Sequence, residues 1–248
     1  MSAVASCFEI LYQDKERNGA ILDYILNLGQ RYYDAFFADA RYTAYLEGIK
    51  NTLIISLFAV LLGVLLGVLV AVVKYVAKGS KNPVIRFLDK VCRATPVYLQ
   101  IFIIANLIFT ARNMEIYAAI TCFGINSGAY VSDIIRAGIE SIDRGQFEAG
   151  QSLGLSQGTI MKSIILPQAI KNILPALGNE FITLIKETAV AGAIAVTDVT
   201  KAAQYIGSRT WDVLPPLFIA AGIYLIIVLG LTKLLGMFER RLAASDHH

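Results

Sequence analysis

The strongest constraint on this chain is a run of residues, Thr52 to Val73, without a single charged side chain. A helix needs about 20 apolar residues to cross the hydrocarbon layer of a bilayer. A second uncharged run of that length covers residues 213–232. The whole chain is 56% hydrophobic and only 17% charged, which is too little charge for the surface of a soluble domain of this length. The sequence therefore predicts an integral membrane protein.

Three further stretches are apolar enough to count as spans. Residues 94–111 and 116–132 carry no charge, and the second is expected to continue as a helix to Ile139. Residues 172–196 are apolar overall but contain three charged side chains. We therefore expect an all-α integral membrane protein with five transmembrane helices, at about 51–75, 93–111, 114–139, 172–196 and 213–237.

Basic residues near the span ends predict the orientation of the chain. The connectors after the first and third spans and the C-terminal tail hold most of the nearby lysines and arginines, whereas the two connectors on the opposite side hold only Arg112, Lys201 and Arg209. The N-terminus is therefore expected outside the cell and the C-terminus in the cytoplasm. The chain divides into an N-terminal segment 1–46, a membrane domain 47–240 and a tail 241–248.

The segment before the first span is rich in aromatic residues between positions 20 and 46. Asp34, Asp39 and Arg41 are interleaved with them, so this stretch cannot itself cross the bilayer. Aromatic side chains mixed with charges are typical of a membrane–water interface. We expect an N-terminal amphipathic helix that lies in the outer interface.

The longest cytoplasmic connector, residues 141–170, predicts two short helices joined by a turn. Gly154 can adopt positive φ and end the first helix, and Ser156 can cap the second. Pro167 is expected to end the second helix before the next span begins. Each short helix has an apolar side that a loop at a membrane surface has no reason to expose, so another protein is expected to dock there.

The same connector resembles the EAA loop of ABC-importer permeases. In that motif Glu-Ala-Ala is followed after three residues by glycine and, after nine more, by Ile-x-Leu-Pro. This chain has Glu148-Ala149, Gly154 and Ile164-x-Leu166-Pro167 at that spacing. Gly150 replaces the second alanine, and it is equally small but weakens the helix slightly. Other segments are similar to the polar amino-acid branch of the family, over about residues 45–240: Arg93-Ala94-Thr95-Pro96, Asn126-Ser127-Gly128-Ala129-Tyr130 and Lys186-Glu187-Thr188.

The resemblance implies a permease subunit in the plasma (inner) membrane of a bacterium that imports a polar amino acid, with a basic one as an option, by alternating access. It also implies an extracytoplasmic amino-acid-binding protein and a cytoplasmic ATPase in two copies, into which the connector inserts a coupling helix. The implied coupling residues are Glu148, Ala149, Gly150, Leu153, Gly154, Ile164, Leu166 and Pro167. Two departures, Asp133 in place of glutamate and Ala189-Val190 in place of Ser-Leu, leave the substrate open.

The chain has no GxxxxGK[ST] motif to hold ATP phosphates, so ATP and Mg are expected on the partner ATPase and no cofactor on this chain. We expect no enzyme activity, catalytic residue or metal site, because the only histidines are His247 and His248. Five spans cannot enclose a path alone, so a second permease half is expected, most simply as a homodimer surrounded by lipid. Gly63-x-x-x-Gly67 and Gly124-x-x-x-Gly128 allow close helix contacts within or between subunits.

Charges inside a span are costly and usually functional. Glu180 lies near the middle of its span without a basic partner on the same helix nearer than Lys186, so we expect its carboxylate to meet the ammonium or basic side chain of the substrate. Asp133 and Arg136, three residues apart, are expected to form a structural ion pair. The full set of candidate path residues is Glu180, Asn179, Thr183, Asn126, Ser127, Lys186 and Glu187, where the last two could equally be structural.

Three other classes of protein fit the sequence less well. An ion-coupled secondary transporter is the main alternative, but it has no use for the loop from Glu148 to Pro167. An intramembrane enzyme would need a catalytic dyad, which this sequence lacks. A helix-turn-helix would suit the connector, yet it has no basic recognition face beyond Lys162 and lies between spans, so no nucleic-acid partner is expected.

Overall fold

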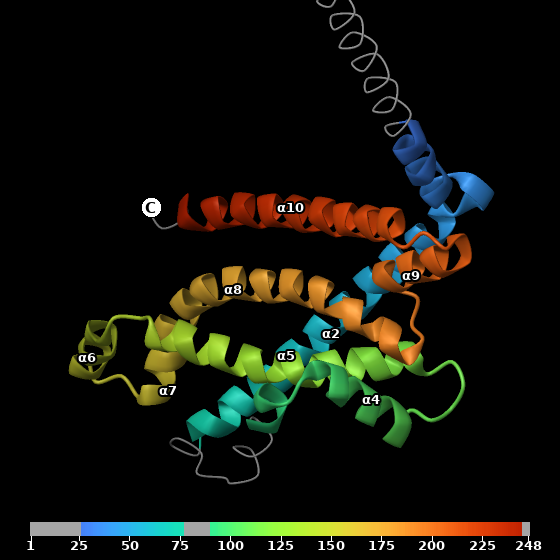
Figure 1. The fold of residues 1–248 in the computed structure, drawn as a ribbon. Coiled ribbons are helices and arrows are strands. Elements are labelled where there is room, and N and C mark those ends of the chain that lie inside the picture. The colour runs from blue at the N-terminus through green and yellow to red at the C-terminus, as the bar shows by residue number, and fades with distance from the viewer. Residues whose placement is uncertain (1–25, 77–89, 245–248) are drawn as a thin grey trace, which may run out of the picture.

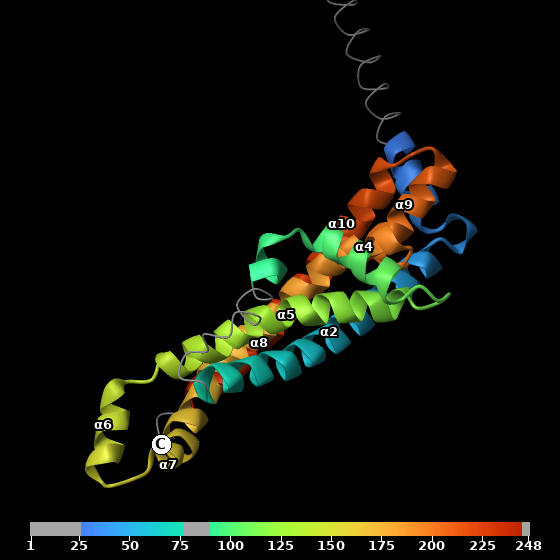
Figure 2. The ribbon, with the colours of Figure 1, turned by 90° about the horizontal axis from the view of Figure 1, so that it is seen from below.

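The computed structural model describes residues 26–76 and 90–244, and every regular element in these two ranges is a helix. Four long helices form an elongated bundle (Figures 1 and 2). They are α2 (Tyr42–Val76), α5 (Glu115–Glu140), α8 (Leu166–Glu187) and α10 (Leu214–Ala244). Shorter elements complete the described chain: residues 26–36, η1 (Ala38–Ala40), residues 90–94, α4 (Val97–Leu107), α6 (Arg144–Ser152), α7 (Gln157–Ile160), η2 (Met161–Ile165), η3 (Thr188–Ile194) and α9 (Val199–Thr210).

The short elements gather at the two ends of the bundle (Figure 1). One end carries α6, α7 and the C-terminal part of α10, and the other carries residues 26–36 and α9. By length and composition, α2 and α10 are each able to cross a membrane, which agrees with the two uncharged runs. The apolar helix α4 has only 11 residues, and α5 and α8 are more polar than α2 and α10.

Glycines allow α2 and α5 to pack in close contact. A Cβ added to Gly63 would lie 2.7 Å from Ser127 Oγ, and one added to Gly67 would lie 2.5 Å from Val131 Cγ1. In the 124–128 motif, a Cβ added to Gly124 would lie 2.6 Å from Leu62 Cδ2, and one added to Gly128 would lie 3.0 Å from Leu66 Cβ. Both GxxxG motifs therefore serve packing within one subunit, which decides between the two alternatives left open by the sequence.

The connector from η3 to α10 contains a helix, α9, that the sequence reading did not predict. Asp198 caps this helix, and its buried carboxylate accepts hydrogen bonds from the backbone N–H groups of Thr200 (2.9 Å) and Lys201 (3.0 Å). The hydroxyl of Tyr224 donates a third, at 3.1 Å. An aspartate at the N-cap satisfies backbone donors that the first turn leaves without partners. Asp198 therefore caps α9 and, through Tyr224, also ties the start of α9 to α10.

The expected span 93–111 is not one helix. The chain is helical over residues 90–94, leaves the helix at Thr95 and Pro96, and resumes in α4 at Val97. Proline has no N–H and its ring disfavours the α conformation in the residue before it. The uncharged stretch is as predicted, but its single-helix interpretation was wrong.

The expectation that Pro167 ends a helix was also wrong. The chain stays helical from Gln157 through α7, the π-helical turn η2 and α8 to Glu187. Pro167 occupies the first turn of α8, where the missing N–H costs little. The α8 helix therefore begins six residues before the expected span 172–196, and beyond Glu187 it tightens into the 3₁₀ helix η3.

Candidate functional site

Two of the candidate path residues, Ser127 on α5 and Glu180 on α8, are in direct contact. The Ser127 hydroxyl donates a hydrogen bond to Glu180 Oε1 at 2.7 Å. Ser127 is 1% exposed and Glu180 is partly buried. Among the described residues Glu180 has no ion-pair partner. The carboxylate is thus held in place by a neutral donor that leaves its second oxygen available.

The depth of the Ser127–Glu180 pair in the membrane can be estimated from its neighbour α2. Ser127 Oγ lies against Gly63, which is 11 residues after Thr52 and 10 before Val73 in the uncharged run. At 1.5 Å per residue, either end of the run is about 15 Å away. Because the hydrocarbon core is about 30 Å thick, the Ser127–Glu180 pair lies at the midplane of a membrane that α2 spans.

The other α8 candidates differ in their surroundings. Asn179 and Thr183 are exposed on this subunit. Lys186, also exposed, lines a pocket of about 300 Å³ with Thr200 and Tyr224. Of the candidate path residues, only Ser127 is hydrogen-bonded to Glu180. Lys186 instead lines a separate pocket together with residues of α9 and α10.

Asn126 holds the helix interruption at residues 95–96. Its side-chain amide is 6% exposed and donates to the carbonyl of Cys92 at 2.9 Å. The Gln100 amide donates to the same carbonyl at 2.9 Å and to the Thr95 carbonyl at 3.0 Å. These side chains satisfy carbonyls that the broken helix cannot pair internally.

The predicted Asp133–Arg136 ion pair is present, at 3.7 Å, but Asp133 has a closer partner. Arg93 Nη1 lies 2.8 Å from Asp133 Oδ2, and Arg93 Nη2 donates to the Ala129 carbonyl at 2.6 Å. The guanidinium also lies over the Tyr130 ring, 5.1 Å from its centroid. The sequence reading missed this contact because the two residues are forty positions apart and nothing local links them.

The connector 141–170, named here the coupling loop after the role that the resemblance implies, has the caps that the sequence predicts. Gly154 has φ +74°, and the hydrogen bonds Leu155 N–Gly150 O (3.1 Å) and Gly154 N–Gln151 O (2.9 Å) form a Schellman motif at the end of α6. The Ser156 hydroxyl accepts from Thr159 N and caps α7. Both local predictions are confirmed, and Asp143, which caps the start of α6 through Gly145 N, was not predicted.

Only one of the three Glu-Ala-Gly residues packs inside the loop. Gly150 is buried, and a Cβ there would lie 2.8 Å from Ile160 Cγ1. Glu148 and Ala149 are exposed, and Leu153 is 78% exposed. Of the later motif residues, Ile164 is half-buried, while Leu166 and Pro167 are exposed. The helix α6 thus rests on α7 through Gly150 and presents its other side at the end of the bundle (Figure 1).

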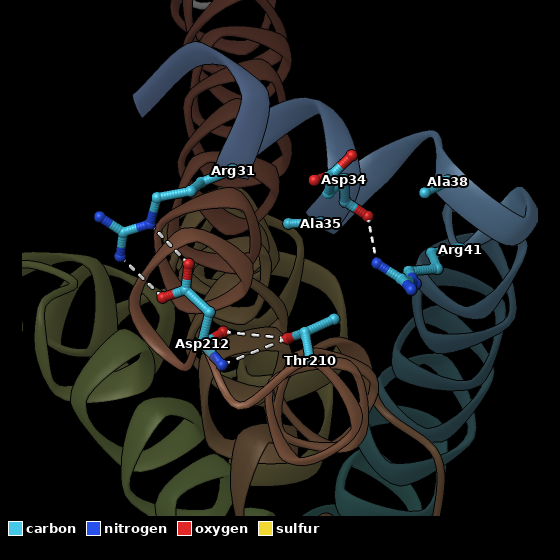
Figure 3. Close-up of a pocket in the computed structure, with 7 residues that line it drawn as sticks. All are labelled: Arg31, Asp34, Ala35, Ala38, Arg41, Thr210 and Asp212. Atoms are coloured by element: carbon cyan, nitrogen blue, oxygen red, sulfur yellow. Dashed lines mark hydrogen bonds and ion pairs between the residues drawn. The ribbon is translucent and has the colours of Figure 1, made fainter. Parts of the chain in front are cut away.

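The opposite end of the bundle has a polar pocket of about 500 Å³ (Figure 3). The Arg31 guanidinium donates two hydrogen bonds to Asp212, at 2.6 and 2.8 Å, and Arg41 donates to the Asp34 carbonyl. The hydrogen bond from Arg31 holds the pKa of the Asp212 carboxyl below its usual range. The ion pair attaches the N-terminal helix, residues 26–36, to the turn between α9 and α10.

Comparison with known proteins decides which family these features belong to. Residues 63–244 match the family described as the binding-protein-dependent transport system inner membrane component. The chain belongs to this family. It is 40% identical over 204 residues to the arginine transport system permease protein ArtQ of Bacillus subtilis, covering 81% of this chain and 93% of that protein. It is 35% identical over 201 residues to the glutamine transport system permease protein GlnP of Escherichia coli, covering 79% and 92%.

Among solved structures, an amino acid ABC transporter crystallised with histidines matches with a TM-score of 0.76 and 40% identity, over 83% of this chain and 98% of that chain. The fold and family of this binding-protein-dependent permease therefore confirm the resemblance carried by the sequence. The family match includes the coupling loop, the Ser127–Glu180 pair and the Arg93–Asp133 pair.

Proposed function

We propose that this permease imports a polar amino acid, with ATP hydrolysis by a cytoplasmic partner as the energy source. The amino-acid assignment rests on the relatives named for arginine and glutamine transport and on the transporter crystallised with histidines. The relatives differ in their named substrates, so we assign the class of polar amino acids and leave the member open. The five-span topology, with the N-terminus outside, belongs to the same proposal.

The observation that carries the coupling part of the proposal is the exposed side of α6. The helix is capped at both ends by its own residues and packs chiefly on α7 and η2. Exposed apolar groups beside a carboxylate, Leu153 and Ala149 beside Glu148, suit insertion into a groove of another protein. Because α7 continues through η2 into α8, a push on α6 is transmitted directly to the helix that carries Glu180.

The solute-binding part of the proposal rests on Glu180. A carboxylate at the membrane midplane without an ion-pair partner among the described residues is costly unless a ligand or water compensates it. The ammonium group of an amino acid, or a basic side chain, provides that compensation. Asn179 and Thr183, exposed on neighbouring positions of α8, supply further hydrogen-bonding groups for the solute.

The partners follow from the same assembly. A second permease half, most simply a second copy, closes the path opposite α8. Two ATPase subunits receive the two copies of α6 and hold ATP and Mg. An extracytoplasmic binding protein delivers the amino acid at the end of the bundle that carries α9 and residues 26–36.

The coupling proposal is tested by co-purification. The tagged permease is expected to retain its ATPase partner, and Glu148→Lys is expected to remove that ATPase while the permease stays folded. Glu140→Lys, an exposed carboxylate at the end of α5, is the matched control and is expected to keep the complex. Retention of the ATPase by Glu148→Lys with full ATP-driven uptake would contradict the docking of α6.

A further inference from the structure

The helix interruption at Thr95–Pro96 lies at the same depth as Glu180. Asn126, which binds the Cys92 carbonyl, directly precedes Ser127, which binds Glu180. Ser127 in turn lies against Gly63 at the middle of the uncharged run of α2. If α2 spans the bilayer, non-helical backbone of this chain therefore lies close to the midplane.

The interruption is also exposed. Ala94, Thr95 and Pro96 are exposed on this subunit, and so are Tyr98 and Leu99 in the first turn of α4. Asn126 and Gln100 satisfy the carbonyls of Cys92 and Thr95, but no side chain among the described residues caps the start of α4 at Pro96, so the N–H groups of its first turn need another partner. Backbone of this kind does not face lipid at this depth, because no water is available there to satisfy it. It is tolerated where protein covers it or where it lines a water-filled cavity.

The structure holds this interruption against α5 with one arginine. Arg93 contacts about one turn of α5, through Asp133 (2.8 Å), the Ala129 carbonyl (2.6 Å) and the Tyr130 ring. Charge-assisted hydrogen bonds of this length are among the stronger polar contacts in proteins. Because Arg93 lies two residues before Thr95, these contacts fix where the interruption begins.

We infer that Thr95 and Pro96 form a wall of the solute path, and that Arg93 and Asp133 are positioning residues for it. This inference rests on the proposed function, which makes Glu180 a solute contact. The break would then face water and solute. The two other possible surroundings are lipid and a closed interface with the second permease half. Thr95, whose side-chain oxygen accepts from the Gln100 amide at 2.8 Å, then belongs to the surface that the amino acid passes.

The wall is tested by the chemical reactivity of a cysteine at position 95. In a chain with Cys7, Cys92 and Cys122 replaced by alanine, Thr95→Cys is reconstituted with the ATPase and treated with a charged, membrane-impermeant thiosulfonate. We expect modification, and slower modification in the presence of the transported amino acid. Leu225→Cys on α10, at a site 58% exposed in the single subunit, is the control and is expected to react only with a lipid-soluble maleimide.

Reaction of Thr95→Cys with the maleimide alone would place the break in lipid, and reaction with neither reagent would place it in a closed interface. Either result overturns the inference. Labelling requires no transport, so it reads water access even if the amino-acid assignment fails. Conversely, normal amino-acid uptake together with an unreactive Thr95→Cys leaves the proposed function in place and removes only this inference.

The positioning role is tested through kinetic constants. Arg93→Gln is expected to raise the KM for the amino acid about tenfold, the order expected for loss of charge-assisted hydrogen bonds, with maximal ATP hydrolysis unchanged. Asp133→Asn should act in the same direction, while Asp133→Glu, which keeps the charge, should restore a KM close to the original. Arg136→Gln, at the more distant partner of Asp133, is the control. An unchanged KM in Arg93→Gln and Asp133→Asn would contradict the assignment.

Discussion

One hydrogen bond holds the acidic side chain in the middle of the bundle. The Ser127 hydroxyl, 2.7 Å from Glu180, fixes the position of the acid without neutralising its charge. The second oxygen of a carboxylate held in this way can bind water or a cationic ligand in turn. Because the first oxygen stays bonded to the serine, the side chain needs little rearrangement. An arginine or lysine in the place of Ser127 would instead satisfy the charge permanently, and the acid would be a structural element.

Glu180→Gln removes the charge and keeps the shape of the side chain. We expect amino-acid uptake by the reconstituted complex to fall about tenfold or more, because a charge-assisted contact with the ammonium becomes a neutral one. Glu180→Asp should retain part of the activity. Glu47→Gln, an exposed acid on α2, is the control, and unchanged uptake of every amino acid by Glu180→Gln would exclude Glu180 as a solute contact.

Gly63→Ala tests the contact between α2 and α5. The new methyl group would lie 2.7 Å from Ser127 Oγ and 2.8 Å from its Cβ, so the helices must separate. Overpacking of this kind costs about 1–3 kcal/mol, and a lower melting temperature of the purified complex is expected. Gly230→Ala on α10, where nothing lies within 4 Å of the added atom, should melt like the parent protein. Equal melting temperatures of all three proteins would refute the close contact.

At the scale of helices, local signals were readable in the sequence and long-range partners were not. Gly154 and Ser156 act on backbone groups within a few residues, so their capping roles followed from residue type and spacing. Pro167 carried an ambiguous signal, because proline suits both the end of one helix and the first turn of the next. The break at Thr95–Pro96 was not predicted, because hydropathy reports how apolar a stretch is and not whether it forms one continuous helix.

Gly154→Ala tests the α6 cap. A side chain at φ +74° is strained by about 1–2 kcal/mol, so the end of α6 should loosen and coupling between ATP hydrolysis and uptake should weaken. Gly158→Ala, in the helical α7 with no atom near the added Cβ, serves as the matched control and should be neutral. The measurement is the ratio of amino acid transported to ATP hydrolysed, and an identical ratio in both variants would contradict a mechanical role for this cap.

The attachment of the N-terminal helix should depend on pH through Asp212. Its pKa is lowered in the folded protein by the hydrogen bond from Arg31, so the pair stabilises the fold above the unfolded pKa and loses that effect as pH falls through the lower folded value. Arg31→Gln should therefore increase protease cleavage of the 26–36 segment at pH 7. The difference from the parent protein should begin to shrink below about pH 4, the usual range of an aspartate, and should vanish only once the pH is below the lowered folded pKa. A difference that persists or grows in acid would contradict this account.

At the scale of the whole molecule, the distribution of short elements gives the protein two distinct ends. The α6–α7 loop lies at one end and the Arg31–Asp212 pair at the other, and α8, which carries Glu180, runs between these ends. The continuous helical run from Gln157 to Glu187 joins the α6–α7 end of the bundle to the helix that carries Glu180. Under the proposed function, this rigid run would carry a movement of α6 to Glu180, as rigid-body movements do in other switching proteins. The sequence did not show the continuity, because Pro167 was read as the end of a helix.

The proposed function requires that energy enters at α6 from an ATP-hydrolysing partner. Its most direct test is uptake of labelled amino acid into proteoliposomes that contain this permease with and without the ATPase, at equal permease density. We predict uphill accumulation only with the ATPase and ATP, and none for Glu148→Lys under the same conditions. Accumulation against a gradient by the permease alone, driven by a proton or sodium gradient, would contradict the claim and favour a secondary transporter.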